Sequence, residues 1–367
     1  MLANIKRSLL CISAISCMSL YASTIAAPII VNNPITIGDY VDSNTKVATR
    51  LTNTDDNYWS TEEDNTYVFN RDKGKNDKHW IPKNTVTIDE DYTLKLKTTG
   101  YTSNPIVLYC LNTFTNNGNV TIDNYCALTI DYRTTASDPI SDSTNNGTIN
   151  INKGILGLWY STKLNNTGTI TLKGGSHVMI CDNSTLSNTG TITLTGSSYI
   201  FSYIHIRSKS TLNNAGTITS TGSGRIRIYM DSTLNNTGTI TAKGSSHIYI
   251  DTNTTLNNTG TIDISNITDL SKWCSSGTFK LGGGSTFILP KSITNKIDTS
   301  KWSKPITLNG TSDNKVNIVI PKDCEYIKDI GNNKKGVLFS AIQRATGFTF
   351  DGKRNNVKFG WQTSIYN

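Results

Sequence analysis

The sequence predicts an all-β fold: a single-stranded parallel β-helix, a solenoid in which each coil stacks on the one before it. Three observations lead to this prediction. The motif Asn-x-Gly-x-Ile/Val occurs seven times in the 367 residues, apolar and polar residues alternate after each copy, and turn sequences interrupt every run before it reaches helix length. We expect about 22 residues and three strands in each coil, a right-handed winding, and atypical capping segments at both ends.

The glycine of the motif fixes the period of the repeat. Successive copies of this glycine are separated by 29, 21, 22, 26, 22 and 22 residues. A spacing this regular indicates one small unit that is repeated and stacked in one dimension. The glycines, which we interpret as structural, are Gly118, Gly147, Gly168, Gly190, Gly216, Gly238 and Gly260.

Three short alternating runs in each unit predict the three strands of a coil. In the third unit, Leu164 lies in the first run, Ile170 and Leu172 in the second, and Val178 and Ile180 in the third. Threonine and serine fill most positions between these apolar residues, as expected for strands with one buried and one exposed face. Neighbouring coils of such a stack lie about 4.8 Å apart.

An asparagine lies two residues before each of these glycines, whereas the residue before it varies. Asparagines stacked at one corner of successive coils can hydrogen-bond to the copies above and below, which forms an amide ladder. We also expect this asparagine and the following glycine to supply the left-handed backbone of a sharp bend. The asparagines predicted to form the ladder are Asn116, Asn145, Asn166, Asn188, Asn214, Asn236 and Asn258.

The unit of 26 residues contains an insertion. Four extra residues, such as those from Tyr199 to Ser202, are expected to bulge out of its coil. Insertions of this kind map to one face of a solenoid, which is often the binding face. A tolerated loop without function is the alternative.

The first residues predict export. Lys6 and Arg7 precede an apolar stretch, 8–20, that is too short to span a bilayer, and small residues follow at 24–26. This pattern is typical of a cleaved signal peptide over 1–26, and a lipoprotein site at Cys17 is the alternative. No later segment is apolar enough to span a membrane as a helix. We expect an exported protein at the cell surface, outer membrane-associated or secreted, with the periplasm left open.

Composition divides the remaining chain into three parts. Residues 27–100 are irregular and are expected to form an N-terminal cap with irregular early coils, because the first coil of a solenoid exposes an open edge. Residues 101–265 contain the regular repeats, and residues 266–367 are expected to form irregular coils and a C-terminal cap. Five cysteines follow the leader, and their connectivity does not follow from the sequence; Cys110 with Cys126 and Cys274 with Cys324 are candidate pairs.

One predicted face differs from the threonine-lined faces. The outward positions of the third strand carry histidine, tyrosine and arginine, whereas isoleucine and valine fill the inward positions. Such a face is suited to contact with a ligand surface, and cross-strand pairing that stabilises the sheet is the alternative. The candidate contact residues are His177, Tyr203, His205, Arg225, Arg227, Tyr229, His247 and Tyr249.

The sequence does not predict an enzyme, a metal site or a cofactor. The tract 53–56 resembles part of a polygalacturonase signature, but its companion elements are missing, and Asp182, Asp231 and Asp251 are isolated at turns. His177 and His247 are three coils apart, about 14 Å at strand spacing, which is too far for one zinc ion. The net charge of +8 is scattered and accompanies no nucleic-acid-binding motif, so we expect no specific nucleic acid partner.

The repeat Leu-Asn-Asn-Thr-Gly-Thr-Ile-Thr, followed by Gly-Ser-Ser and an Ile-x-Ile run, resembles the passenger repeats of bacterial autotransporters and filamentous-haemagglutinin-like adhesins. The resemblance covers about 112–264 and implies a β-helix. The segment from 336 to 367 loosely resembles the closing segment of such passengers, but no barrel-sized run of strands follows it.

This resemblance implies a non-enzymatic adhesin-like binding module, with glycans or host cell-surface proteins as partners. The alternative is a structural subunit of a surface filament or matrix, assembled head to tail through open coil ends, although capping segments favour a monomer. A polysaccharide-active β-helix enzyme is a distant third hypothesis.

Overall fold

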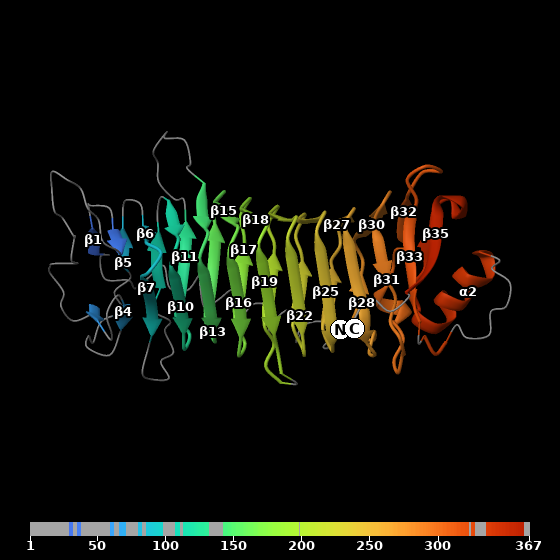
Figure 1. Ribbon diagram of the computed structural model, residues 1–367, viewed down its shortest axis with the longest axis horizontal. Coiled ribbons are helices and arrows are strands. Elements are labelled where there is room, and N and C mark those ends of the chain that lie inside the picture. Colours follow the sequence, from blue (N-terminus) through green and yellow to red (C-terminus); the bar gives the residue numbers. More distant parts are fainter. Residues whose placement is uncertain are drawn as a thin grey trace, which may run out of the picture.

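The computed structural model describes residues 29–31, 35–37, 59–61, 66–70, 80–82, 86–97, 107–110, 113–131, 142–197, 199–322, 324–326 and 335–362. They form an elongated parallel β-solenoid with three strands per coil and about 23 residues per turn (Figure 1). The predicted fold class is therefore confirmed. The predicted signal peptide, 1–26, and the tract 53–56 lie outside the described residues.

The strands form three sheets that run the length of the solenoid. Sheet A contains, in spatial order, β1 (Ile29–Val31), β5 (Trp80–Pro82), β8 (Val107–Cys110), β11 (Ala127–Asp131), β14 (Ile155–Trp159), β17 (His177–Ile180), β20 (Tyr203–Ile206), β23 (Arg225–Ile228), β26 (His247–Ile250) and β29 (Cys274–Ser275). Sheet B contains β2 (Ile35–Ile37), β6 (Val86–Ile88), β9 (Phe114–Asn116), β12 (Ser143–Asn145), β15 (Lys163–Asn166), β18 (Thr185–Asn188), β21 (Thr211–Asn214), β24 (Thr233–Asn236), β27 (Thr255–Asn258), β30 (Thr278–Gly282), β32 (Ile306–Asn309) and β34 (Phe350–Asp351). Sheet C contains β3 (Trp59–Thr61), β4 (Thr66–Asn70), β7 (Thr93–Lys97), β10 (Asn119–Asp123), β13 (Thr148–Asn152), β16 (Thr169–Lys173), β19 (Thr191–Thr195), β22 (Thr217–Thr221), β25 (Thr239–Gly244), β28 (Thr261–Ile267), β31 (Thr286–Ile288), β33 (Val316–Pro321) and β35 (Val357–Gln362).

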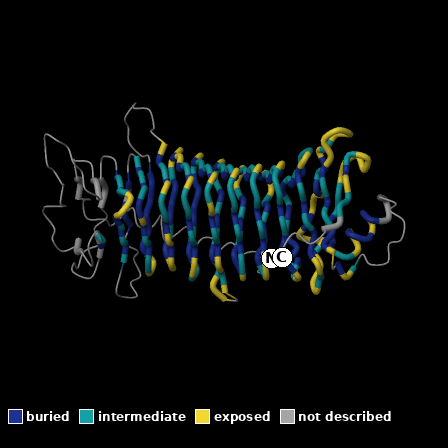
Figure 2. The backbone as a smooth tube through the Cα atoms, in the orientation of Figure 1, coloured by how far each residue is buried: buried dark blue, intermediate teal, exposed yellow. Residues whose placement is uncertain are grey.

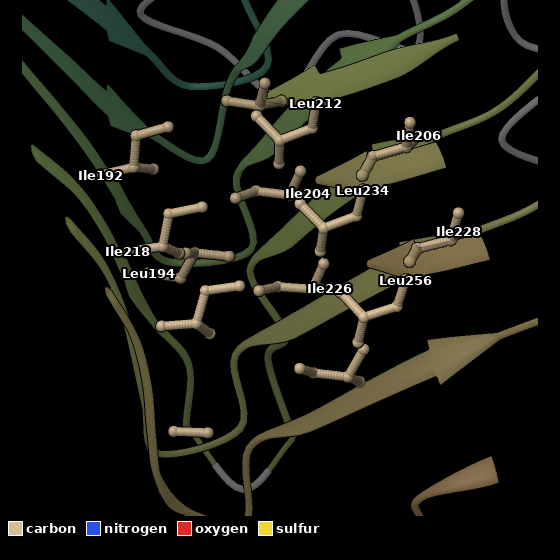
Figure 3. Packing of buried hydrophobic residues seen from close by; sticks show 14 of the residues in the cluster. Ile192, Leu194, Ile204, Ile206, Leu212, Ile218, Ile226, Ile228, Leu234 and Leu256 are labelled. Carbon is tan, nitrogen blue, oxygen red and sulfur yellow. The ribbon is translucent and has the colours of Figure 1, made fainter. Parts of the chain in front are cut away.

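The register stacks like residues on like residues. Leu164 pairs with Leu186 in sheet B, and Ile170 pairs with Ile192 in sheet C. The apolar side chains of all three sheets therefore meet in one continuous column, which Figure 3 shows from close by. Exposed residues gather at the turns between sheets, as Figure 2 shows. Burial of this column supplies most of the driving force for folding.

The asparagines of the repeat lie in one file at the end of the sheet B strands, and each is buried. Asn166 donates from Nδ2 to Oδ1 of Asn188 over 2.6 Å, and Asn188 donates in the same way to Asn214 over 2.7 Å. Six such bonds connect the seven residues from Asn116 to Asn258. The file ends where Ile88 lies beside Asn116 and Leu281 lies beside Asn258.

The corner glycines have a different role from the one expected. None of them has a left-handed backbone; positive φ occurs instead at the other two corners, as at Asp182 (φ 54) and Gly174 (φ 65). The expectation of a left-handed Asn-x-Gly corner is therefore wrong. A β-carbon added to Gly190 would lie 2.1 Å from the carbonyl oxygen of Gly168 on the preceding coil. Close approach between stacked backbones, rather than φ, excludes larger residues here.

A second file of polar residues, which the sequence analysis does not predict, lies at the corner between sheets A and B. The backbone N–H of Ser184 donates to Oγ of Ser210 over 3.2 Å, and that of Ser210 donates to Oγ of Ser232 over 3.1 Å. These serines are buried, and their hydroxyl groups accept hydrogen bonds from backbone N–H groups at the turn of the neighbouring coil. The small hydroxyl residues of the repeat thus stabilise a second corner.

Both ends of the solenoid depart from the repeat. At the N-terminal end, β3 pairs antiparallel with β4 and covers the edge of sheet C. At the C-terminal end, an α-helix, α2 (Lys335–Thr346), lies against the last coils (Figure 1). The sequence predicts irregular coils and a cap over 266–367, whereas this helix was not predicted. Within the described residues no helix has the length and hydropathy of a membrane-spanning segment.

Aromatic side chains close the core beneath this helix. Phe348 is fully buried, and its ring centroid lies 5.2 Å from that of Trp302 and 5.6 Å from that of Phe287. From α2, Leu338 and Ile342 are buried in the same cluster. In this last part of the solenoid β34 and β35 extend sheets B and C, and α2 adds buried apolar side chains to the end of the column.

The five cysteines that follow the predicted leader are all thiols in this structure. Cys110 lies in register with Ile130, so the candidate partner Cys126 is offset from it along the sheet. Burial raises the pKa of the Cys110 thiol. The candidate disulfides of the sequence analysis are therefore not formed.

Candidate binding face on sheet A

The eight candidate contact residues lie together on the outer side of sheet A. Strand pairing aligns His177, Tyr203, Arg225 and His247 in one row across β17, β20, β23 and β26. A second row, two residues further along each strand, contains Met179, His205, Arg227 and Tyr249. Tyr229 follows directly after β23. We call these eight predicted residues the basic aromatic face.

The rings of this face stack on one another. The ring centroid of Tyr203 lies 5.0 Å from that of His177 and 4.8 Å from that of His205, with interplanar angles of 11° and 26°. The stack continues from His205 to Tyr229 at 6.0 Å and from Tyr229 to Tyr249 at 5.5 Å. Because neighbouring rings cover one another, the inner rings offer their edges rather than their flat faces to a ligand.

The two arginines of the face pack into this stack. Arg225 Nη1 donates to the Tyr203 hydroxyl over 3.0 Å, and Arg227 Nη1 donates to the Tyr229 hydroxyl over 3.0 Å. The guanidinium carbon of Arg227 lies 4.8 Å from the centroid of the Tyr203 ring. Cation–π contact and hydrogen bonding thus hold both guanidinium groups on the sheet.

The electrostatic environment keeps the histidines neutral. Burial, followed by the positive charge of Arg227, lowers the pKa of His177 to about 4. Burial, followed by the charge of Arg225, lowers the pKa of His247 to about 3. Burial, followed by the electrostatic effect of His177 and then of Arg227, lowers the pKa of His205 well below its usual value. At neutral pH the arginines therefore carry the positive charge of the face.

A third arginine belongs to this surface and is missing from the predicted set. Arg207 follows β20, its Nε donates to Cys181 Sγ over 3.2 Å, and its guanidinium carbon lies 5.2 Å from the Trp159 ring centroid. After correction for the insertion, Arg207 has the same offset from the repeat glycine as Tyr229. That offset was the signal that could have identified it.

The insertion borders this surface. It lies in the turn between β19 and β20, where Tyr199 is 92% exposed and Ile200 is 46% exposed. Phe201 folds back onto the sheet, so that the Arg225 guanidinium carbon lies 3.3 Å from its ring centroid. The insertion is therefore attached to the face at Phe201 and exposes an aromatic ring two residues before it.

The turn aspartates Asp182, Asp231 and Asp251 do not form a cluster that could hold a metal ion. Within the part of the chain that the structure describes, no three side chains of histidine, cysteine, aspartate or glutamate are arranged to bind a metal ion. Asp182, Asp231 and Asp251 lie at the turns that follow sheet A strands on different coils. Asp182 and Asp231 have positive φ, so the geometry of the turn accounts for their positions.

Comparisons of the chain with protein-family models, with curated proteins and with solved structures found no match. The class of protein is therefore defined by the fold: a parallel β-solenoid with one chemically distinct face.

Proposed function

We propose that this chain is an exported β-helix protein of the cell surface or the extracellular space. It acts as a non-enzymatic, adhesin-like binding module, and the basic aromatic face is its contact surface. The supporting observation is the concentration of histidine, tyrosine and arginine on four consecutive strands of sheet A. The outward rows of sheet C at the same coils consist mainly of threonine, as in the pair Thr193 and Thr219.

A rigid, flat array supports this role physically. Its side chains project from a sheet whose register is fixed by the core, so little conformational freedom is lost when a partner binds. Tyrosine and arginine are the residue types that most often dominate binding energy at interfaces. The passenger-like repeat and the predicted leader support export to the surface.

Assembly of the solenoid into a filament is less well supported. Head-to-tail stacking requires open coil ends, whereas α2 lies over the C-terminal end of the apolar column and β3 covers the edge strand β4. We therefore treat the protein as a monomeric binding module rather than a filament subunit.

Simultaneous replacement of Tyr203, Arg225, Arg227 and Tyr249 with serine should strongly weaken binding. The measurement is retention on a glycan array and on intact animal cells, for which we expect a decrease of at least about tenfold. The decrease is expected because both hydrogen-bonded arginines and two rings of the stack are lost together.

The matched control replaces Lys173, Thr193, Thr219 and Lys243 with serine on the outer side of sheet C. It should bind like the original chain. Undiminished binding by the sheet A variant, with its unfolding transition still cooperative, would remove the face from the proposal. Absence of any binding by the original chain would remove the function.

A further inference from the structure

Among the described residues, Arg207, Arg225 and Arg227 on the outer side of sheet A form no ion pair with an acidic side chain. Each guanidinium has five N–H donors, and each makes one hydrogen bond: Arg207 to Cys181 Sγ, Arg225 to the Tyr203 hydroxyl and Arg227 to the Tyr229 hydroxyl. The ion pairs of the described residues, Lys163 with Asp142 and Lys301 with Asp298, involve none of them. Most of their N–H donors therefore have no acceptor among the described residues; Nε of Arg225 and Nε of Arg227 are buried, which leaves the terminal Nη groups for a ligand.

These arginines lie on two adjacent coils. Arg225 and Arg227 are two residues apart on β23, and Arg207 follows the neighbouring strand β20. Like charges on neighbouring positions repel one another, and no ion pair among the described residues offsets this repulsion. The charge pattern is complementary to a ligand that carries several anionic groups.

The ring stack restricts the kind of anion further. The rings from His177 to Tyr249 cover one another, so they do not form the open aromatic platform on which the bases of single-stranded nucleic acid stack. A free ring is available at Tyr199 on the insertion, which is attached to the cluster through the contact of Phe201 with Arg225. An exposed amphipathic ring two residues from Phe201, which contacts the Arg225 guanidinium, fits a sugar ring with a carboxylate substituent.

We infer that Arg207, Arg225 and Arg227, together with Tyr199, form a binding site for a carboxylated glycan. The guanidinium groups receive the carboxylates in charge-assisted hydrogen bonds, and Tyr199 covers the apolar side of a neighbouring sugar ring. This inference rests on the proposed function and names the ligand class of the same face.

The test compares the binding of the full chain to immobilised hyaluronan, whose acidic groups are carboxylates only, with binding to neutral dextran. Arg225→Gln combined with Arg227→Gln should weaken hyaluronan binding by at least about tenfold. Lys173→Gln combined with Lys243→Gln removes the same charge from the exposed side of sheet C and should change it less than about twofold. Tyr199→Ser should weaken binding, whereas Tyr125→Ser, at a tyrosine that is 44% exposed outside the insertion, should not.

Two further probes identify the ligand class. Single-stranded oligothymidylate and phosphatidylserine vesicles should bind more weakly than hyaluronan at the same ionic strength. The inference would be overturned if the double arginine variant and the double lysine variant lost hyaluronan binding equally. It would also be overturned if either probe bound more tightly than hyaluronan. Binding to cells or neutral glycans that is lost in the sheet A serine variant, without hyaluronan binding, would retain the proposed function and reject the carboxylated ligand. A matched thermal unfolding curve for each variant establishes that it is folded.

Discussion

Replacement of Gly190 with alanine should lower the free energy of unfolding by about 3 kcal/mol or more. The added β-carbon would lie 2.1 Å from the carbonyl oxygen of Gly168 and 2.4 Å from that of Thr167. Both oxygens belong to the backbone of the preceding coil, which cannot move aside without separating paired strands. Denaturant and thermal unfolding of the full chain measure the effect.

The control for this variant is Gly360→Ala in β35. A β-carbon at Gly360 would meet nothing within 4 Å, and its backbone is not left-handed. Alanine there should change the free energy of unfolding by less than about 1 kcal/mol. The change should be stabilising, because alanine reduces the conformational entropy of the unfolded chain. Equal destabilisation by both variants would show that close approach between coils is not the reason for the corner glycine.

Replacement of Asn188 with alanine should be the next most damaging change, at about 2–4 kcal/mol. Asn188 accepts from Asn166 over 2.6 Å and donates to Asn214 over 2.7 Å. Its removal leaves the Oδ1 of Asn214 buried without its donor and the Nδ2 of Asn166 without its shortest acceptor. Unfolding by denaturant measures the loss, and the transition should remain cooperative.

Asn116, at the end of the ladder, is the position with which Asn188 is compared. Asn116 makes one of the amide hydrogen bonds of the file, to Oδ1 of Asn145, and its own Oδ1 is buried and has no hydrogen-bond partner among the described residues. The neighbouring coil has Ile88 at the equivalent position. Asn116→Leu should therefore cost less than Asn188→Ala, and a larger loss at Asn116 than at Asn188 would mean that the amides do not act as a continuous ladder.

The parts of the fold that could be predicted are those in which local pattern and tertiary register agree. Alternation from Leu164 to Ile180 places apolar residues on one side of three strands, and a core column is the only way to bury them all. The same register, corrected for the insertion, places Tyr203 opposite His177, and the structure has this pairing. A repeat thus converts sequence spacing into spatial proximity.

Other features could not be predicted, because the residues involved are compatible with two different structures. Glycine is favoured both by left-handed backbone and by close approach, so the repeat alone cannot separate them. In α2, Leu338 and Ile342 fit a helical period, but the alternating runs around this segment also suit a strand. The contacts of Arg225 with Phe201 and Tyr203 depend on side-chain conformation, which spacing does not encode.

The central claim is that every repeat unit, whatever its length, adds one coil of the same rise. Pairs of spin labels on the outer side of sheet C test it most directly, with one label at Thr121 and the other at Thr193, Thr219, Thr241 or Asp263. These four positions lie in register on successive strands, including the pair Thr193 and Thr219 that flanks the insertion. The measured distance should grow by about 4.8 Å at each step, and the 26-residue step should equal the 22-residue steps. Distances that grow with the number of intervening residues, or that show no constant step, would contradict the stacked-coil account.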